Sequence, residues 1–207
     1  RGSGTQWLAE VKAHQFLDVI GPLGKAFAYP SKLTTCLLVA EGHGSAPIYF
    51  LGQELLARGK RVDMLVGAET HELVFKPIEG KRLAQTIVIT TEDGSLGETG
   101  GVIDVLPQVV ESTGAQVVYA ATGRQTLRRI SEFCAERRIP SQVAVEEEMA
   151  CGIGLCFTCT VPVIRKDGSG YDNLRACIDG PVFNPARILW DRWMGEEPHM
   201  VATPPEG

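Results

Sequence analysis

Four cysteines in the last third of the chain constrain its fold more than any other feature. Cys151, Cys156 and Cys159 follow the spacing C-x4-C-x2-C, and Cys177 lies further along the chain. In the plant-type [2Fe–2S] pattern, one loop supplies three thiolates at this spacing and a distant segment supplies the fourth. The spacing therefore predicts these four thiolates as the ligands of a [2Fe–2S] cluster, and one-electron chemistry as the role of the chain.

Two other uses of the same cysteines stay open. A structural zinc site usually shows two close C-x2-C pairs, whereas this chain has one such pair, Cys156 and Cys159. A disulfide framework is typical of small secreted domains, and a chain of 207 residues is long enough to bury a core without one. Gly152 and Gly154 favour the cluster, because residues without a Cβ let backbone N–H groups turn toward sulfur.

The composition is that of a globular protein with a mild acidic balance. Hydrophobic residues make up 44% of the chain, and the formal net charge is −5. Without a basic stripe, this balance argues against a nucleic-acid surface. No apolar run reaches the length of a membrane span and no signal peptide opens the chain, so we expect no membrane partner and a reducing cytoplasm as the location. The remaining cysteines, Cys36 and Cys134, are predicted to be small core residues.

Residues 34–140 alternate between strand and helix patterns. Their strands are rich in Val, Leu and Ile without polar alternation, which suits a parallel sheet buried on both faces. The region is therefore predicted to be a small doubly wound α/β domain. Strands are expected at 35–42, 60–68, 85–93 and 116–123, and helical segments at 45–59, 69–75, 102–113 and 124–139.

The turn after the first of these strands reads GHGSAP, at residues 42–47. Two glycines permit a tight strand-to-helix turn close to a phosphate, and the N-terminus of the following helix offers free N–H groups. Gly42 and Gly44 are therefore candidates for binding a nucleotide phosphate. A tight turn that binds nothing is an equal alternative, because a single G-x-G is a weak motif.

The N-terminal 33 residues are too few for a complete domain of their own. They are predicted to contain a short helix with Thr5 as its N-cap, and its apolar side is formed by Trp7, Leu8 and Val11. A short strand is expected at 16–27, where glycine and proline mark turns.

The segments on either side of the cysteines carry charge and aromatic residues. The acidic run at 146–148 is expected to form a solvated face, with tuning of the iron site as its alternative. Trp190 and Trp193 are expected to pack inside the last domain, with anchoring of a partner subunit as the alternative. From residue 191 onward we expect a surface arm, because periodicity is lost and proline is frequent.

Several segments read together resemble a known family. In order along the chain they are DVIGPLG, GHGSAP, EDGSLGETGGVIDVL, EEEMACGIGLCFTC and CIDGPVFNPARILW. This set resembles the electron-transfer subunits of the two-subunit, NAD-linked (type B) dihydroorotate dehydrogenases, which belong to the ferredoxin-reductase superfamily. The resemblance covers nearly the whole chain, and its most specific part is the cysteine loop paired with CIDGPVF.

The resemblance implies three domains and three cofactors. Residues 1–33 would be the C-terminal remnant of an FAD-binding β-barrel, 34–140 an NAD-binding-like domain, and 141–207 the [2Fe–2S] domain. The flavin diphosphate contact maps onto Gly4 and Thr5. Electrons would pass one at a time from the FMN of a separate dihydroorotate-oxidising subunit, through the cluster, to FAD and then as hydride to NAD⁺. This chain shows no acid or base for dihydroorotate oxidation, so that chemistry is assigned to a partner in a hetero-oligomer.

Three departures from the family pattern stand out. The Arg-Pro-x-Ser-type flavin segment of the family would precede Arg1. Residues 120–124 read Ala-Ala-Thr-Gly-Arg, whereas relatives carry a Cys-Gly-Pro motif next to the nicotinamide ring at this place. Glu41 stands where relatives usually place glycine, and its carboxylate should repel a pyrophosphate unless it turns away.

Two other functions stay open beside this one. The chain could be the reductase subunit of another flavin and iron–sulfur complex, of the sulfhydrogenase or transhydrogenase type. It could also be a degenerate, non-catalytic module whose metal is structural.

Overall fold

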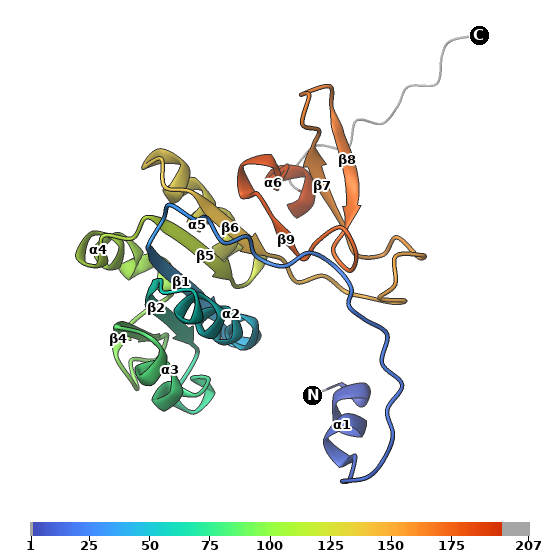
Figure 1. Cartoon of the computed structure of the whole chain (residues 1–207), viewed down its shortest axis with the longest axis horizontal. Helices are drawn as coiled ribbons and strands as arrows, with labels where there is room; N and C mark the ends of the chain where they lie inside the picture. Colours follow the sequence, from blue (N-terminus) through green and yellow to red (C-terminus); the bar gives the residue numbers. More distant parts are fainter. Residues whose placement is uncertain (1, 196–207) are drawn as a thin grey trace.

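A single seven-stranded sheet organises the protein (Figure 1). A computed structural model describes residues 2–195. The strand order is β4-β3-β2-β1-β5-β6-β9, and every neighbouring pair is parallel except β6 with β9. The strands are β1 (Thr35–Glu41), β2 (Arg61–Ala68), β3 (Thr86–Thr91), β4 (Glu98–Thr99), β5 (Val117–Ala121), β6 (Ser141–Ala144) and β9 (Val182–Phe183).

Helices cover both faces of the sheet because alternate residues of the strands point to opposite sides. On β1, Leu37 and Val39 pack with α4 (Val102–Thr113) and α5 (Arg124–Glu136). Leu38 and Ala40 pack on the other face with α2 (Ser45–Ala57). The predicted doubly wound α/β architecture is confirmed.

A two-stranded antiparallel hairpin lies between β6 and β9 in the sequence. It is formed by β7 (Thr160–Ile164) and β8 (Tyr171–Arg175), with the short helix α6 (Trp190–Met194) beside it. Its apolar residues share one core with α4 and α5, and Trp193 is buried in that core. The predicted packing of Trp193 inside the protein is therefore confirmed. Residues 196–207, which include most of the expected surface arm, lie outside the described part of the chain.

The N-terminal segment differs from its prediction. Helix α1 (Ser3–Glu10) begins after Gly2, so Thr5 is not its N-cap, and it buries none of its residues. Figure 1 shows α1 apart from the sheet, joined to it by an extended segment. No strand forms at 16–27, although Lys25 makes an isolated bridge to Pro181. The expected apolar face of the helix stays largely exposed, since Trp7 is 62% and Leu8 53% exposed.

The other predicted elements of residues 34–140 form, with shifted ends. The predicted helix at 69–75 is reduced to a single 3-10 turn at His71–Leu73, and α3 (Pro77–Leu83) follows as an element the sequence analysis did not predict. Strand β6 extends the sheet beyond residue 140, where the sequence analysis places a domain boundary. Cys36 and Cys134 are buried, each 1% exposed, as predicted.

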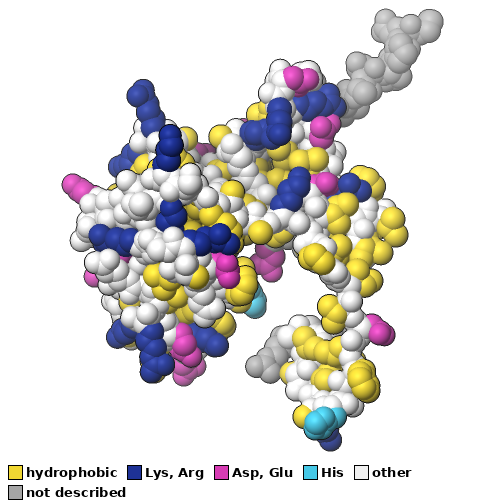
Figure 2. Space-filling view, in the orientation of Figure 1, with side chains coloured by type: hydrophobic (Ala, Val, Ile, Leu, Met, Phe, Trp, Pro, Cys, Tyr) yellow, Lys and Arg dark blue, Asp and Glu magenta, His cyan; other side chains and the backbone are white. Residues whose placement is uncertain are grey.

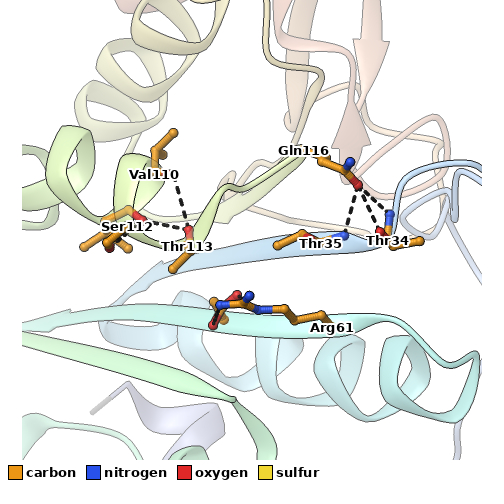
Figure 3. A network of polar contacts seen from close by, with 9 residues as sticks. Thr34, Thr35, Arg61, Val110, Ser112, Thr113 and Gln116 are labelled. Carbon is orange, nitrogen blue, oxygen red and sulfur yellow. Dashed lines mark hydrogen bonds and ion pairs between the residues drawn. The ribbon is translucent and has the colours of Figure 1, made fainter.

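Polar contacts lie at the amino-terminal ends of the central strands (Figure 3). The Gln116 side-chain oxygen accepts hydrogen bonds from the backbone N–H groups of Thr34, at 2.8 Å, and Thr35, at 3.2 Å. The fully buried Asp63 carboxylate is paired with Arg61, whose Nε lies 2.9 Å away. The Gln116 contacts hold the start of β1 beside β5, and the Arg61 N–H donates to the Thr34 carbonyl oxygen at 2.8 Å and holds β1 beside β2. The Arg61–Asp63 pair lies within β2.

Exposed apolar side chains gather on two segments outside the sheet. Figure 2 shows apolar side chains on the surface of both segments. One segment is the extended N-terminal stretch, where Phe16 and Val19 are almost fully exposed. The other is the cysteine loop, where Leu155 and Phe157 are exposed. No helix within residues 2–195 is both long enough and apolar enough to cross a membrane.

The turn between β1 and α2 gives a direct test of the fold. A Cβ added to Gly44 would lie 1.9 Å from the carbonyl oxygen of Ala121, so Gly44→Ala should lower the free energy of unfolding by about 1–3 kcal/mol. Gly123→Ala is the matched control, because an added Cβ meets nothing within 4 Å there. Urea unfolding curves of the two variants provide the measurement. Equal stability of the two variants would contradict this packing.

Candidate functional site

The register of the β7–β8 hairpin brings the distant cysteine to the loop. Thr160 pairs with Arg175, so Cys159 lies directly before the first pair and Cys177 two residues after it. The Ala176 N–H donates to the Cys159 carbonyl oxygen at 2.7 Å and extends the ladder by one more bond. The sequence-predicted ligands from the two segments therefore meet at one end of the hairpin.

The four thiols are arranged as two close pairs. Cys151 Sγ accepts hydrogen bonds from the backbone N–H groups of Leu155, at 3.3 Å, and Cys156, at 3.4 Å. Cys177 hydrogen-bonds to Cys159, and it is close enough to Cys151 to be affected by its charge. Within residues 2–195, no three His, Cys, Asp or Glu side chains are close enough to share a single metal ion. Cys156 hydrogen-bonds to Cys151, so the two pairs are Cys151 with Cys156 and Cys159 with Cys177.

The two pairs differ in their electrostatic surroundings. Hydrogen bonds from Thr158, whose hydroxyl lies 3.2 Å from Cys156 Sγ, lower the pKa of Cys156 to about 6. Burial raises the pKa of Cys177, and its contact with Cys159 adds to the shift. Cys156 is exposed while Cys159 and Cys177 are buried. One pair therefore reaches the surface and the other faces the core.

Arg175, at the end of β8, holds the cysteine loop in place. Its Nη1 donates to the Gly154 carbonyl oxygen at 2.9 Å, and its guanidinium lies 4.8 Å from the centre of the Phe157 ring. Asp179 accepts from Arg175 Nε at 2.9 Å and fixes the side chain. Gly154 adopts a φ of +83°, and an added Cβ would lie 2.3 Å from Ile178. The predicted need for glycine at this position has a steric reason as well as a conformational one.

A cleft of about 630 Å³ lies at the carboxyl ends of the parallel strands. It is the place where open α/β sheets bind their ligands, beside the point at which the strand order reverses between β1 and β5. Gly42 contributes to its wall from the turn after β1. Gly101 just before α4, Gly123 just before α5, and Thr126 in the first turn of α5 line another part. We call it the strand-end cleft. Its acidic lining residues are Glu41, Glu69, Glu92 and Glu146.

A second cleft, of about 560 Å³, adjoins the first and is mainly apolar. The two share His43, Thr122 and Glu146. Gly44 lies in this second cleft, so the two glycines of the turn line neighbouring cavities. We call it the apolar cleft. Its larger side chains come from four parts of the chain: Phe27, Tyr29, Phe50, Met149 and Val182.

Arg124, the first residue of α5, joins the sheet to the cysteine-bearing region. Its guanidinium donates to Glu147 at 2.6 Å and to the Trp193 carbonyl oxygen at 3.0 Å. The Trp193 indole N–H donates to the same Glu147 oxygen at 2.6 Å. The prediction of a solvated acidic run is wrong for Glu147, whose side chain is 11% exposed because it is held in this network.

The predicted site residues fall into three places. The four cysteines meet at the end of the hairpin. Gly42 lines the strand-end cleft, and Gly44 lines the adjoining apolar cleft. Gly4 and Thr5 lie on the exposed helix α1, which the structure does not bring to either cleft. Thr158 and Arg175 also belong to the site, although neither was predicted from the sequence. A hydroxyl within the C-x2-C spacing was a visible signal for the first, whereas no local pattern marks the second.

Comparisons with known proteins agree with this site. Residues 146–189 match the family model described as the iron–sulfur cluster binding domain of dihydroorotate dehydrogenase B. The fold is similar to that in a structure of NADH-dependent reduced ferredoxin-NADP oxidoreductase, with a TM-score of 0.77 and 22% identity. That match covers 94% of this chain and 67% of the other.

Two curated relatives are similar over most of the chain. Both are named dihydroorotate dehydrogenase B (NAD(+)), electron transfer subunit. The one from Desulforamulus reducens is 31% identical over 92% of this chain and 72% of its own length. The one from Bacillus mycoides is 38% identical over 88% of this chain and 69% of its own length. The chain therefore belongs to the family of electron transfer subunits of dihydroorotate dehydrogenase B.

Proposed function

We propose that this chain passes electrons one at a time between the FMN of a dihydroorotate-oxidising partner subunit and FAD and NAD, in pyrimidine biosynthesis. The observation that carries the proposal is the meeting of Cys151, Cys156, Cys159 and Cys177 at the end of the β7–β8 hairpin. Family membership supports the same role.

The cysteine site fits a [2Fe–2S] cluster on its own chemistry. Such a cluster takes four thiolates, and hydrogen bonds to sulfur stabilise its negative charge. Cys151 already accepts two backbone N–H bonds and Cys156 accepts the Thr158 hydroxyl. The thiols form two pairs, Cys151 with Cys156 and Cys159 with Cys177, and two thiolates for each of two irons is the ligand set of such a cluster. This pairing supports the cluster over the structural zinc alternative. We propose these four cysteines as the ligands.

The two clefts fit the flavin and nicotinamide cofactors of the family. A bound FAD would collect single electrons and release them in pairs as hydride. Phe27, Phe50 and Met149 give the apolar cleft the character of a pocket for a flat ring system. We propose Gly42 and Gly44 as contacts of NAD. Gly4 and Thr5 lie on α1 outside both clefts, so their contact with the flavin diphosphate stays a prediction from the family resemblance. The division into domains at residues 33 and 140 is part of the same proposal.

The partner subunit supplies the dihydroorotate chemistry, in a hetero-oligomer. The exposed loop carrying Cys156 presents Leu155, 75% exposed, and Phe157, 57% exposed. Aromatic and aliphatic side chains of this kind are typical of protein interfaces. All six cysteines are free, and this supports a reducing cytoplasm as the location.

Replacing one ligand tests the relay. Cys156→Ser should remove the visible absorption and the electron paramagnetic resonance signal of the cluster. It should also lower NAD⁺ reduction by the assembled enzyme by more than about 100-fold, because a lost ligand costs at least as much as a lost supporting contact. The partner's reaction with artificial acceptors should continue. Cys134→Ala is the matched control, since this buried cysteine lies outside the site. NAD⁺-linked turnover that survives in Cys156→Ser would reject the relay.

The support given by Arg175 can be tested separately. Arg175→Gln loses the guanidinium bonds to Gly154 and Asp179 and the contact with Phe157, so the cluster should be lost to a chelator about tenfold faster. The decay of visible absorption measures this rate. Arg165→Gln is the control, because it removes an exposed ion pair from the same hairpin. If the two variants decay at the same rate, Arg175 does not support the loop.

A further inference from the structure

Glu41 occupies an unusual position at the end of β1. It lines the strand-end cleft immediately before Gly42, and it is only partly exposed. Its Oε1 lies 3.4 Å from the backbone N of Val102, at the start of α4, and Thr126 of α5 hydrogen-bonds to the same carboxylate. The side chain therefore has not turned away from the cleft. It lies along the cleft wall between β1 and the first turns of two helices.

The N-terminus of α4 would ordinarily attract a phosphate, because its first N–H groups have no partner within the helix. Two of these donors are already used by carboxylates of the chain itself. The Gly101 N–H donates to Asp104 Oδ2 at 2.9 Å, and the Val102 N–H faces Glu41. The protein's own anion thus stands where a ligand anion would be favoured.

The remaining lining of the cleft adds to the negative potential. Glu69, Glu92 and Glu146 face the same space, and no lysine or arginine is among the described residues that line it. Arg129 and Glu92 are the charged groups that act most on Glu41, with opposite effects, and burial outweighs both and raises its pKa. The Thr90 hydroxyl beside the cleft is fully buried and has no hydrogen-bond partner among residues 2–195. The charged side chains that line the cleft therefore oppose an anion.

We propose that Glu41 is a specificity-determining residue that weakens the binding of nucleotide pyrophosphates in the strand-end cleft. This inference rests on the proposed function, because it concerns the site assigned to NAD. The pyrophosphate of a dinucleotide would have to approach Gly42 beside the Glu41 carboxylate. The pyrophosphate binds well only when the Glu41 carboxyl group is neutral or moves away from α4. Glu41 weakens the binding of a dinucleotide with an additional phosphate still more, because the ligand then carries more negative charge.

The test uses ADP-ribose, which carries the pyrophosphate, and adenosine, which carries no charge. Binding of each to the full chain is measured by calorimetry. Glu41→Gln should tighten ADP-ribose binding about tenfold or more and leave adenosine binding unchanged, because only the charge opposing the pyrophosphate is removed. Glu41→Gly should act in the same direction. Glu79→Gln, on the first turn of α3 and outside the cleft lining, is the matched control.

The pH dependence gives a second measurement. A carboxyl group with a raised pKa is neutralised as the pH falls, so the wild-type chain should bind ADP-ribose more tightly at low pH. Glu41→Gln should lose most of this dependence, and what remains belongs to Glu69, Glu92, Glu146 and His43 of the same cleft.

Three outcomes would overturn the inference. They are equal or weaker ADP-ribose binding in Glu41→Gln, an equal gain for adenosine, and no binding of ADP-ribose to any variant. The cluster signal, recorded on the same samples, separates these outcomes from failure of the proposed relay. Loss of that signal would affect the relay alone.

Discussion

The register of one short hairpin determines whether this protein has a redox site at all. Pairing of Thr160 with Arg175 places Cys159 and Cys177 side by side although they are far apart in the sequence. A shift of one residue would turn the side chains of one strand to the opposite face and separate the thiols. Val161 and Val163 are buried in the main core, which fixes the register. Hydrophobic packing thus brings Cys159 and Cys177 together.

The same packing fixes the hairpin to the sheet. The core that contains the cysteine pair also contains residues of α4 and α5, and Arg124 connects α5 to Glu147 and Trp193 beside it. Sites built on rigid, mutually packed elements are held more precisely than sites on free loops. An electron relay needs this property, because its centres must keep a fixed separation while no group is transferred between them. The apolar cleft, which Glu147 also lines, is therefore held at a set position relative to the cysteines.

The alternation of strands and helices in residues 34–140 was predictable because buried parallel strands read as continuous apolar runs. The meeting of the four cysteines was predictable because they have a distinctive spacing. The strand predicted at 16–27 does not form, because an apolar segment becomes a strand only where a partner strand is available, and only Lys25 makes a bridge within residues 2–195. The role of Glu147 was also missed. A run of glutamates indicates a solvated face until a distant arginine, here Arg124, pairs with one of them.

The backbone of the strand-end cleft favours a phosphate, whereas the charged side chains of the cleft oppose one. The topology, the glycine turn and the helix N-termini are those of a nucleotide site, and they follow from backbone geometry that relatives share. The charge is set by side chains that the backbone does not dictate, and Glu41 places a carboxylate on α4 where the backbone alone would attract a phosphate. A cleft can therefore keep the shape of a dinucleotide site while its affinity changes through one residue. In this chain packing brings the four cysteines together, and we propose that the carboxylate of Glu41 sets how well the neighbouring cleft accepts a pyrophosphate.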